Sequence, residues 1–300
     1  MSSAQRAALA ATLRNGPQDE GEQSVERMRA GFALLMAGFP VPEDVRRTAT
    51  SIGARPAVLV EPLERSHAGT ILYFHGGSFS LGSPETAMAL TANLVRRTGV
   101  RAISVEYRLA PEHPFPAAID DGVAAYRSLL DDGADPGSIV FAGDSAGGGL
   151  TVTVCLAARD AGLPVPAALL AFSPALDHTR SGDSMRTKEG VDPFFTREGM
   201  RRTGELYLGG ADPEQPLLAP ALHADLRGFP PMLLQVGTDE LLLDDSTRMA
   251  ARARAQEVDV ILDVVARVPH VFPAYTGALD EAGQALDRAA LFLTQHLPAG

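Results

Sequence analysis

Apolar residues recur along the chain with two different spacings. Short apolar runs typical of strands occupy residues 57–60, 70–74, 101–105, 138–142, 167–172, 232–236 and 258–264. Amphipathic stretches with helical spacing lie near residues 85–97, 117–131, 147–161, 245–256 and 279–296. Because strands alternate with helices of this length, the pattern predicts a mostly parallel central sheet flanked by helices on both faces.

Two segments depart from this alternation. Met28 and Phe32, with Val25 and Leu35 on either side, recur every three or four residues and share one face of a helix that ends at GFPVP. This apolar face alone favours packing on the core over a lid above a pocket. Residues 177–228 contain no good strand, so we expect an insertion between two strands that forms a second piece of cap.

Composition narrows the function classes. The 300 residues are 45% hydrophobic and 21% charged, which suits a folded chain with a sizeable core. A net charge of −11 disfavours nucleic acid as a partner. Lys188 is the only lysine and Cys155 the only cysteine, which leaves no disulfide framework or Cys-rich zinc site and almost no candidate for a lysine Schiff base. No run approaches the ~18 apolar residues of a membrane span and no targeting segment is convincing, so we expect a cytoplasmic protein.

The sequence GDSAG at residues 143–147 follows one predicted strand and begins a predicted helix. This strand–turn–helix context is the one that a G-x-S-x-G nucleophile elbow requires. The turn would project the hydroxyl of Ser145 above the sheet, and side chains at Gly143 or Gly147 would collide across it. We therefore predict Ser145 as a catalytic nucleophile at a helix N-terminus, where the helix dipole favours developing negative charge.

A serine hydroxyl needs a base, and in this architecture the chain order is serine, acid, histidine. Only His270 and His296 follow both Ser145 and a plausible acid. Because His296 lies in the last turn of the final helix, where it can interact with the last carbonyls, His270 in a loop after a strand is the predicted base.

The acid is expected on the loop that follows the strand at 232–236. Asp244 and Asp245 are typical of the first turn of the next helix. Asp239 comes immediately after the strand, and we predict it as the acid that orients the histidine, with Glu240 and Asp244 as the main alternatives.

The run ILYFHGG at residues 71–77 ends a predicted strand in His75 and two glycines. An oxyanion hole needs two or three converging backbone N–H groups, and glycine lets the backbone turn them inward. We predict Gly76, Gly77 and Ala146 as these donors, and we expect His75 to brace the loop.

Together, HGG at 75–77, YRLAPEHPFPA at 107–117, GDSAGG at 143–148, Asp239 and His270 resemble the hormone-sensitive-lipase-like family of α/β-hydrolases over roughly residues 57–300. The resemblance implies the α/β-hydrolase fold and a bacterial family IV serine carboxylesterase that hydrolyses short-chain acyl esters through an acyl-enzyme intermediate. It implies that no cofactor is needed and that a homodimer is possible.

The resemblance also implies a domain organisation. A cap would consist of residues 1–50 and an insertion at about 177–228, on an α/β-hydrolase core of residues 51–300. A lid therefore becomes the better interpretation of the first apolar helix. Arg108 and Glu112 in YRLAPE are expected to form an ion pair that braces the loops below the site.

The substrate pocket is less determined than the catalytic groups. The family usually has a third glycine where this chain has Ser78, whose side chain either narrows the pocket or points away. The predicted substrate-binding residues, from the oxyanion loop and the two cap segments, are Ser78, Phe79, Met28, Phe32, Phe194 and Leu206. The expected partner is a small ester with an acetyl to hexanoyl group.

Two alternatives stay open at this point. The same triad attacks any acyl carbon, so an amide deacetylase or a lactonase fits the same motifs. A non-catalytic ligand receptor of this fold is disfavoured, because receptors that resemble the family have lost the catalytic histidine and His270 is present. No cluster of metal ligands is visible in the sequence.

Overall fold

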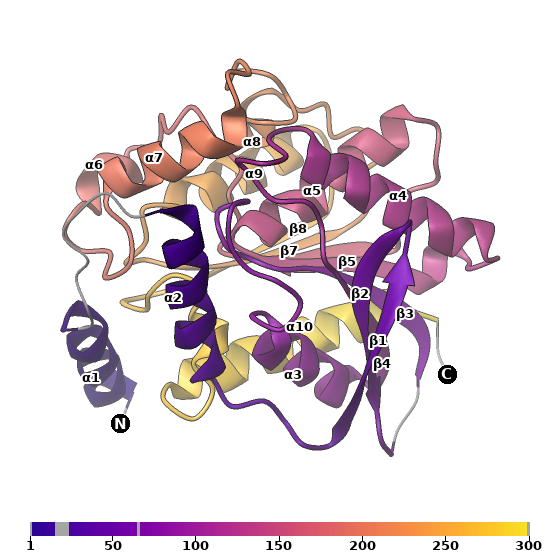
Figure 1. Ribbon diagram of the computed structural model, residues 1–300, viewed down its shortest axis with the longest axis horizontal. Helices are drawn as coiled ribbons and strands as arrows, with labels where there is room; N and C mark the ends of the chain where they lie inside the picture. The colour runs from indigo at the N-terminus through magenta and orange to yellow at the C-terminus, as the bar shows by residue number, and fades with distance from the viewer. Residues whose placement is uncertain (1, 16–23, 65–66, 299–300) are drawn as a thin grey trace.

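The computed structural model describes residues 2–15, 24–64 and 67–298, and in these residues eight strands form one sheet (Figure 1). The strand order is β1-β2-β4-β3-β5-β6-β7-β8. β2 pairs antiparallel with both β1 and β4, and every other pairing is parallel. The chain thus has the mostly parallel sheet that the alternation of strands and helices predicts, and the α/β-hydrolase architecture that the resemblance implies.

The bounds of the elements follow the predicted pattern closely. The strands are β1 (Val45–Ile52), β2 (Arg55–Pro62), β3 (His67–Phe74), β4 (Val100–Val105), β5 (Ile139–Asp144), β6 (Ala168–Phe172), β7 (Met232–Gly237) and β8 (Val260–Val265). The helices are α1 (Ser2–Arg14), α2 (Val25–Ala37), α3 (Met88–Thr98), α4 (Ala117–Asp131), α5 (Ala146–Asp160), α6 (Ser184–Thr187), α7 (Arg197–Leu208), α8 (Pro220–His223), α9 (Leu243–Ala255) and α10 (Asp280–His296), with short 3₁₀ turns η1 (Pro136–Ser138) and η2 (Phe272–Ala274).

Helices α3 and α10 cover one face of the sheet, and α4, α5 and α9 cover the other (Figure 1). In β3, Ile71 and Tyr73 belong to the core under α3 and α10, whereas Leu72 and Phe74 belong to the core under α4 and α5. All four side chains are completely buried. A strand covered on both faces needs apolar residues at every position, and burying each large side chain contributes about 1.5–3 kcal/mol.

Strand β1 is the one strand that the apolar pattern does not predict. Only its end residues, Val45 and Ile52, are buried, and the six residues between them are exposed. An edge strand of this kind has no apolar run and no alternation to detect. Because β1 belongs to the sheet, the expected cap boundary at residue 50 falls inside a strand, and the sheet begins at Val45.

Helices α1 and α2 lie outside these layers (Figure 1). α1 packs Leu9 against Phe272 and Leu279, and its Arg6 forms an ion pair with Glu281 at the start of α10. α2 buries none of its own residues. The segment 177–228 contributes α6, α7 and α8 and no strand, as predicted.

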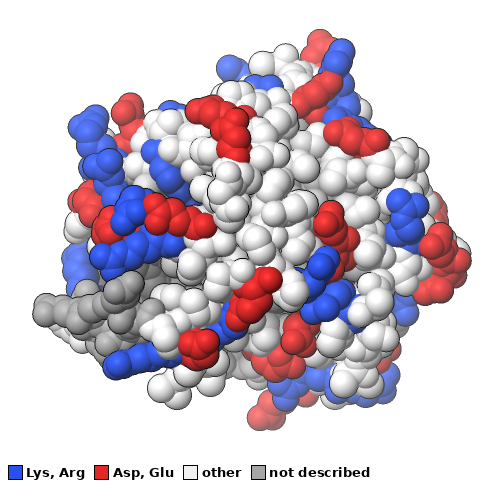
Figure 2. Space-filling view, turned by 45° about the horizontal axis from the view of Figure 1, so that its top comes forward, with Lys and Arg blue, Asp and Glu red and all other residues white. Residues whose placement is uncertain are grey.

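The surface adds two observations. Figure 2 shows acidic and basic side chains interspersed on the face in view, around a central area with few charges. Within the described residues, no helix combines the length and apolar character that crossing a membrane requires.

The contact between the end of β3 and the start of α5 allows no side chain. A Cβ atom on Gly147 would lie 2.0 Å from the carbonyl oxygen of Phe74, and one on Gly143 would lie 2.4 Å from the carbonyl oxygen of Gly147. Both distances are shorter than any real contact, so glycine is required at both positions to let the two backbones approach.

Replacing Gly147 by alanine should therefore destabilise the fold. We expect Gly147→Ala to lower the free energy of unfolding by about 3 kcal/mol or more, because the added methyl must push two backbone segments apart. Thermal unfolding followed by circular dichroism measures this. Gly283→Ala is the matched control, since Gly283 lies in α10 with no atom near its missing side chain, and it should be neutral or stabilising by about 0.4–1 kcal/mol. Equal melting temperatures for the two variants would contradict the steric argument.

Candidate active site

The chemically important side chains gather at the carboxyl ends of the parallel strands. Gly77 follows β3, Ser145 follows β5, Glu240 follows β7 and His270 follows β8. Because parallel strands all end at the same edge of a sheet, residues far apart in sequence converge there. Ser145 itself adopts φ 54° and ψ −118°, the strained conformation of a sharp strand-to-helix turn.

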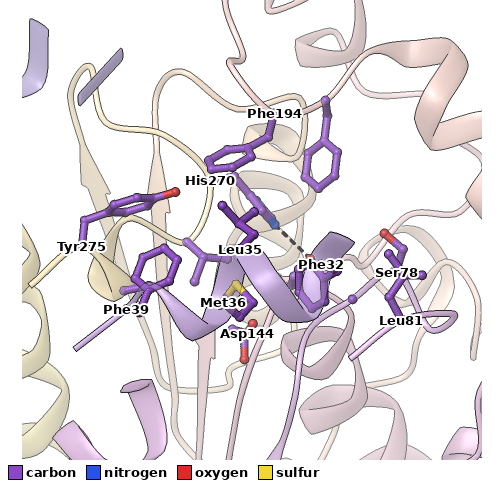
Figure 3. A pocket seen from close by; sticks show the side chains of 15 residues that line it. Phe32, Leu35, Met36, Phe39, Ser78, Leu81, Asp144, Phe194, His270 and Tyr275 are labelled. Carbon is purple, nitrogen blue, oxygen red and sulfur yellow. Dashed lines mark hydrogen bonds between the residues drawn. The ribbon is translucent and has the colours of Figure 1, made fainter. Parts of the chain in front are cut away.

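Three of these side chains form one hydrogen-bonded chain. His270 Nε2 lies 2.9 Å from the hydroxyl of Ser145, and His270 Nδ1 lies 2.8 Å from Glu240 Oε2. With the proton on Nδ1 donated to the carboxylate, Nε2 is free to accept the serine proton. All three residues are buried, and Figure 3 shows the dashed hydrogen bond of His270 at the base of the pocket.

The expectation that Asp239 contacts the histidine is wrong. Glu240, which the sequence left as an alternative, occupies that place. The N–H of Gly237 donates to Glu240, and this turn after β7 aims the glutamate inward. Asp239 is only half-buried, and its carboxylate accepts from the hydroxyl of its neighbour Thr238. The acid nearest the strand end in sequence is therefore not the one that the turn directs at His270.

Ser173, at the end of β6, holds the acid and the histidine loop together. Its hydroxyl donates to Glu240 Oε1 at 2.8 Å and accepts from the N–H of Val271 at 3.0 Å. Glu240 is completely buried, so each of its oxygens needs such a partner. Ser173 was not among the predicted residues, because a lone serine after a strand carries no distinctive signal.

The surroundings of His270 favour its charged form. Burial acts against the imidazolium, but the hydrogen bond and the charge of Glu240, with smaller contributions from Asp192 and Asp144, outweigh it and raise the pKa of His270 above its usual value. His270 therefore binds a proton more tightly in this site than a histidine exposed to water does.

Of the three predicted oxyanion donors, Gly77 and Ala146 line cavities beside Ser145 and Gly76 does not. Gly77 and Ser78 line the cavity beside Ser145, and the N–H of Ala146 is the first of helix α5, where no intrahelical partner exists. Gly76 does not line this cavity, and its N–H is directed at the carboxylate of Asp144. The amide of Ser78, a residue predicted only to bind substrate, is better placed than that of Gly76.

Asp144 and His75 brace this loop from below. Burial raises the pKa of the Asp144 carboxyl to about 6, although the hydroxyl of Tyr73, 2.8 Å away, opposes the rise. His75 is completely buried; its Nδ1 lies 2.8 Å from the carbonyl of Gly76, and its ring stacks on Tyr107. Burial lowers the pKa of His75 to about 4, so the ring is neutral and serves the loop geometry.

A cavity of about 160 Å³ opens over Ser145 and His270. Phe32 on α2 and Phe194 in the insertion line it, as the sequence predicted, together with Ser78. Leu35 and Phe195, which the apolar positions of the cap segments also offered, line it too. The remaining lining residues were not predicted; they are Met36, Phe39, Leu81, Asp144, Val271, Ala274 and Tyr275. Figure 3 shows that side chains of α2 and of the insertion face one another across this space. Met36 and Phe39 continue the spacing of Phe32, so the helical pattern contained the signal for them.

A second, smaller cavity of about 20 Å³ lies on another side of Ser145. Phe79 lines this cavity, where its ring stacks on Tyr207 with centroids 3.8 Å apart. Met28 and Leu206, both predicted to bind substrate, line neither cavity. Leu206 instead packs on the core, and Met28 is half-buried on α2.

Asp192 connects the insertion to the acid loop. Its carboxylate accepts from the N–H groups of Phe194 and Phe195 at 2.8 and 3.0 Å and from that of Leu241 at 2.8 Å. Phe195 meets the ring of His270 edge to face, with centroids 4.8 Å apart. The buried carboxylate of Asp192 thus links the two phenylalanines beside His270 to Leu241, the residue that follows Glu240.

Helix α2 is fastened over the cavity by Arg29. Its guanidinium donates to both carboxylate oxygens of Glu112, at 2.8 and 2.7 Å, and to the carbonyls of Ser80 and Ala110. The hydrogen bond from Arg29 lowers the pKa of Glu112 to about 2. The expected pair of Arg108 with Glu112 is therefore wrong.

Arg108 pairs with Asp121 instead. Its Nη2 lies 2.8 Å from Asp121 Oδ1, and its backbone N–H donates to the same carboxylate. Asp121 lies in the first part of α4, which packs beside this loop, whereas Glu112 faces outward toward α2. Within the described residues, no group of three or more His, Cys, Asp or Glu side chains is arranged to hold a metal ion.

The partner of His270 can be tested without any assay of activity. Glu240→Gln should lower the pKa of His270, because it removes the negative charge that raises that pKa. Asp239→Asn is the matched control and should leave the titration of His270 nearly unchanged. Nuclear magnetic resonance of the imidazole signals as a function of pH measures both, and the opposite ranking would mean that Asp239 is the true partner.

Comparison with known proteins agrees with this geometry. The family described as having the alpha/beta hydrolase fold matches residues 71–274. An acetyl-hydrolase of Streptomyces hygroscopicus is 40% identical over 93% of this chain and 91% of its own, and an esterase of Acinetobacter venetianus is 37% identical over 75% of this chain and 74% of its own. The crystal structure of a hormone-sensitive lipase from a metagenome library superimposes with a TM-score of 0.94 at 39% identity, over 98% of both chains. The chain therefore belongs to the hormone-sensitive-lipase-like family of esterases within the α/β-hydrolases.

Proposed function

We propose that the chain, a serine ester hydrolase of this family, cleaves short-chain acyl esters through a triad of Ser145, His270 and Glu240. The observation that supports this most directly is the chain of hydrogen bonds from Glu240 through His270 to the serine hydroxyl, at the floor of an apolar cavity. This arrangement is the one in which a buried base activates a serine and is itself oriented by a carboxylate.

In the first half of the proposed reaction, His270 Nε2 removes the proton of Ser145 as its oxygen attacks the acyl carbon. The carbonyl oxygen becomes negatively charged and accepts hydrogen bonds from the amides of Gly77, Ser78 and Ala146. When this intermediate collapses, His270 returns the proton to the departing alcohol and the acyl group stays on Ser145.

In the second half, a water molecule takes the place of the alcohol. His270 removes a proton from the water as it attacks the acyl-enzyme, and the released acid restores the serine hydroxyl. Glu240 keeps the imidazole in the tautomer that leaves Nε2 unprotonated, and it stabilises the imidazolium that forms in each half. A neutral amide in place of the Glu240 carboxylate could either accept from Nδ1–H or donate to an unprotonated Nδ1. It would therefore also stabilise the tautomer with the proton on Nε2, which cannot act as the base.

The two cavities suggest where each part of the ester lies. The leaving oxygen must sit next to His270, which lines the larger cavity and not the smaller one. We therefore assign the alcohol part to the larger, apolar cavity and the acyl part to the smaller one. A smaller cavity of about 20 Å³ supports the preference for short acyl groups, and the name acetyl-hydrolase of one relative points the same way.

The cap proposal rests on the position of α2. Phe32, Leu35 and Met36 line the larger cavity from a helix that buries no residue of its own and is fastened by Arg29. We infer that α2 and the insertion at 177–228 together act as the lid over the site. The expectations of a cytoplasmic location and a possible homodimer stay predictions from the sequence.

A series of p-nitrophenyl esters from acetyl to palmitoyl tests the function. We expect the highest kcat/KM between acetyl and about hexanoyl, since each further methylene adds about 0.8 kcal/mol only while it fits. Ser145→Ala should lower the rate by roughly 10⁴–10⁶-fold and abolish labelling by an organophosphate. A maximum at lauroyl or palmitoyl would contradict the small acyl site, and labelling of Ser145→Ala would contradict the nucleophile. Faster cleavage of p-nitroacetanilide than of p-nitrophenyl acetate would favour the amide deacetylase instead.

The dependence on pH should follow the neutral form of His270. Because its pKa is raised above 6.5, kcat/KM should fall as the pH drops through and below neutrality. Glu240→Gln should move this fall to lower pH and reduce the plateau by roughly 10⁴-fold, because the variant loses both the charge and the orienting acceptor. An acid limb that stays in place in Glu240→Gln would assign it to a group other than His270.

A further inference from the structure

The smaller cavity contains an arginine whose side chain has no partner among the residues that the structure describes. Arg180, in the loop before α6, lines this cavity together with Ser145, Ala146 and His178. Its Nη1 is completely buried and makes no hydrogen bond, and in the described part of the chain its guanidinium forms no salt bridge. A buried donor without a partner is costly in free energy, and in a cavity beside a nucleophile it indicates a group that binds there.

The nearby carboxylates do not satisfy this arginine. Asp177 accepts from the hydroxyls of Thr179 and Ser181 and pairs with Arg248 at 3.1 Å. Asp245 accepts from the N–H groups of Leu176 and Asp177. Burial lowers the pKa of Arg180, and the charges of Asp245 and Asp177 oppose that effect from a distance. They help to keep the guanidinium charged while leaving its N–H groups free.

The loop is built to direct Arg180 inward. The carboxylate of Asp177 also accepts from the backbone N–H groups of Thr179 and Ser181, on either side of the arginine. Arg180 has a φ of 56°, a conformation that costs free energy for a residue other than glycine. The hydrogen bonds to Asp177 hold the backbone in this conformation.

His178 adds a second unused polar atom to the same cavity. It is 8% exposed, and its Nδ1 is buried without a partner. Burial holds the pKa of His178 well below its usual value, so the ring is neutral and does not compete with Arg180 as a second cation. Phe79 and Tyr207 pack against the ring, and Phe79 belongs to the apolar wall of the cavity.

We propose that the smaller cavity binds the end of an acyl group that carries a carboxylate, so that half esters of short dicarboxylic acids are substrates, with Arg180 as the residue that binds the carboxylate. The inference rests on the proposed function and on the assignment of this cavity to the acyl side. A guanidinium pairs with a carboxylate through two parallel hydrogen bonds, which no neutral acyl chain can provide. The small volume restricts the acyl group to lengths such as malonyl or succinyl.

Matched pairs of ethyl esters test the proposal. Monoethyl malonate and monoethyl succinate are compared with ethyl 3-methylbutanoate and ethyl 4-methylpentanoate, whose branched ends have nearly the shape of the carboxylate without its charge. Release of ethanol gives kcat/KM for each ester. We expect the wild-type protein to prefer each half ester over its neutral counterpart by about tenfold or more, as a charged hydrogen bond in a buried site provides.

Arg180→Gln should lower this preference by about 10- to 100-fold, because it removes the charge and one of the paired donors. Arg186→Gln is the matched control: its side chain is 73% exposed on α6 and does not line the cavity, so the same loss of charge should leave the preference unchanged. If Arg180→Gln does not fold, inhibition of the wild-type protein decides. Malonate and succinate should then inhibit hydrolysis of p-nitrophenyl acetate competitively and more strongly than 3-methylbutanoate does.

Three results would overturn the inference. The first is no preference for the half esters in a wild-type protein that hydrolyses p-nitrophenyl acetate; loss of acetate hydrolysis as well would instead overturn the proposed function. The second is an equal loss on charged and neutral esters in Arg180→Gln, which would indicate a structural role. The third is a preference for O-acetylglycolate over 2-methylpropyl acetate that disappears in Arg180→Gln, which would place the carboxylate on the alcohol side.

Discussion

The site depends on one close approach of two backbones, where the first turn of α5 passes the end of β3. Gly147 lies so near the carbonyl of Phe74 that only glycine fits, and this contact sets the position of Ser145 relative to the oxyanion loop. The strained serine is held on both sides: its N–H donates to the carbonyl of Phe172, and its carbonyl accepts from the N–H of Ala175. Catalysis by a nucleophile and an oxyanion hole requires both to be in place before the substrate arrives, and the sheet provides this.

The rest of the machinery is attached to the same edge through buried polar contacts. Ser173 joins the acid to the histidine loop, and Asp192 joins the aromatic insertion to the residue after Glu240. Each contact links two loops that leave different strands. Because these groups are buried, losing one partner would leave the other unsatisfied, which makes the arrangement cooperative.

In the proposed function, the two cavities give the alcohol and acyl parts of the substrate different kinds of surface. Helix α2 presents Phe32 and Met36 to the larger cavity without burying them, and Arg29 provides its polar attachment to the core. The smaller cavity combines an apolar wall with Arg180, whose guanidinium pairs with no carboxylate in the described part of the chain. Specificity in this fold comes from such loops and insertions, since the sheet and the catalytic groups leave little room for variation.

Sequence alone predicted the sheet, the flanking helices and the positions of Ser145 and His270, because each has a local signal. Continuous apolar runs mark buried strands, and the glycines around Ser145 and the position of His270 after β8 follow from the backbone geometry that each requires. Strand β1 had no such signal, because six of its eight side chains are exposed and need not be apolar.

Tertiary structure decided which neighbours meet. Asp239 and Glu240 are adjacent and chemically alike, and only the turn after β7 determines that Glu240 reaches His270. In the same way, the packing of α4 and α2 determines that Arg108 pairs with Asp121 and that Glu112 pairs with Arg29. A carboxylate pairs with whichever cation the fold brings within hydrogen-bond distance, and that distance is a property of the packed chain rather than of sequence spacing.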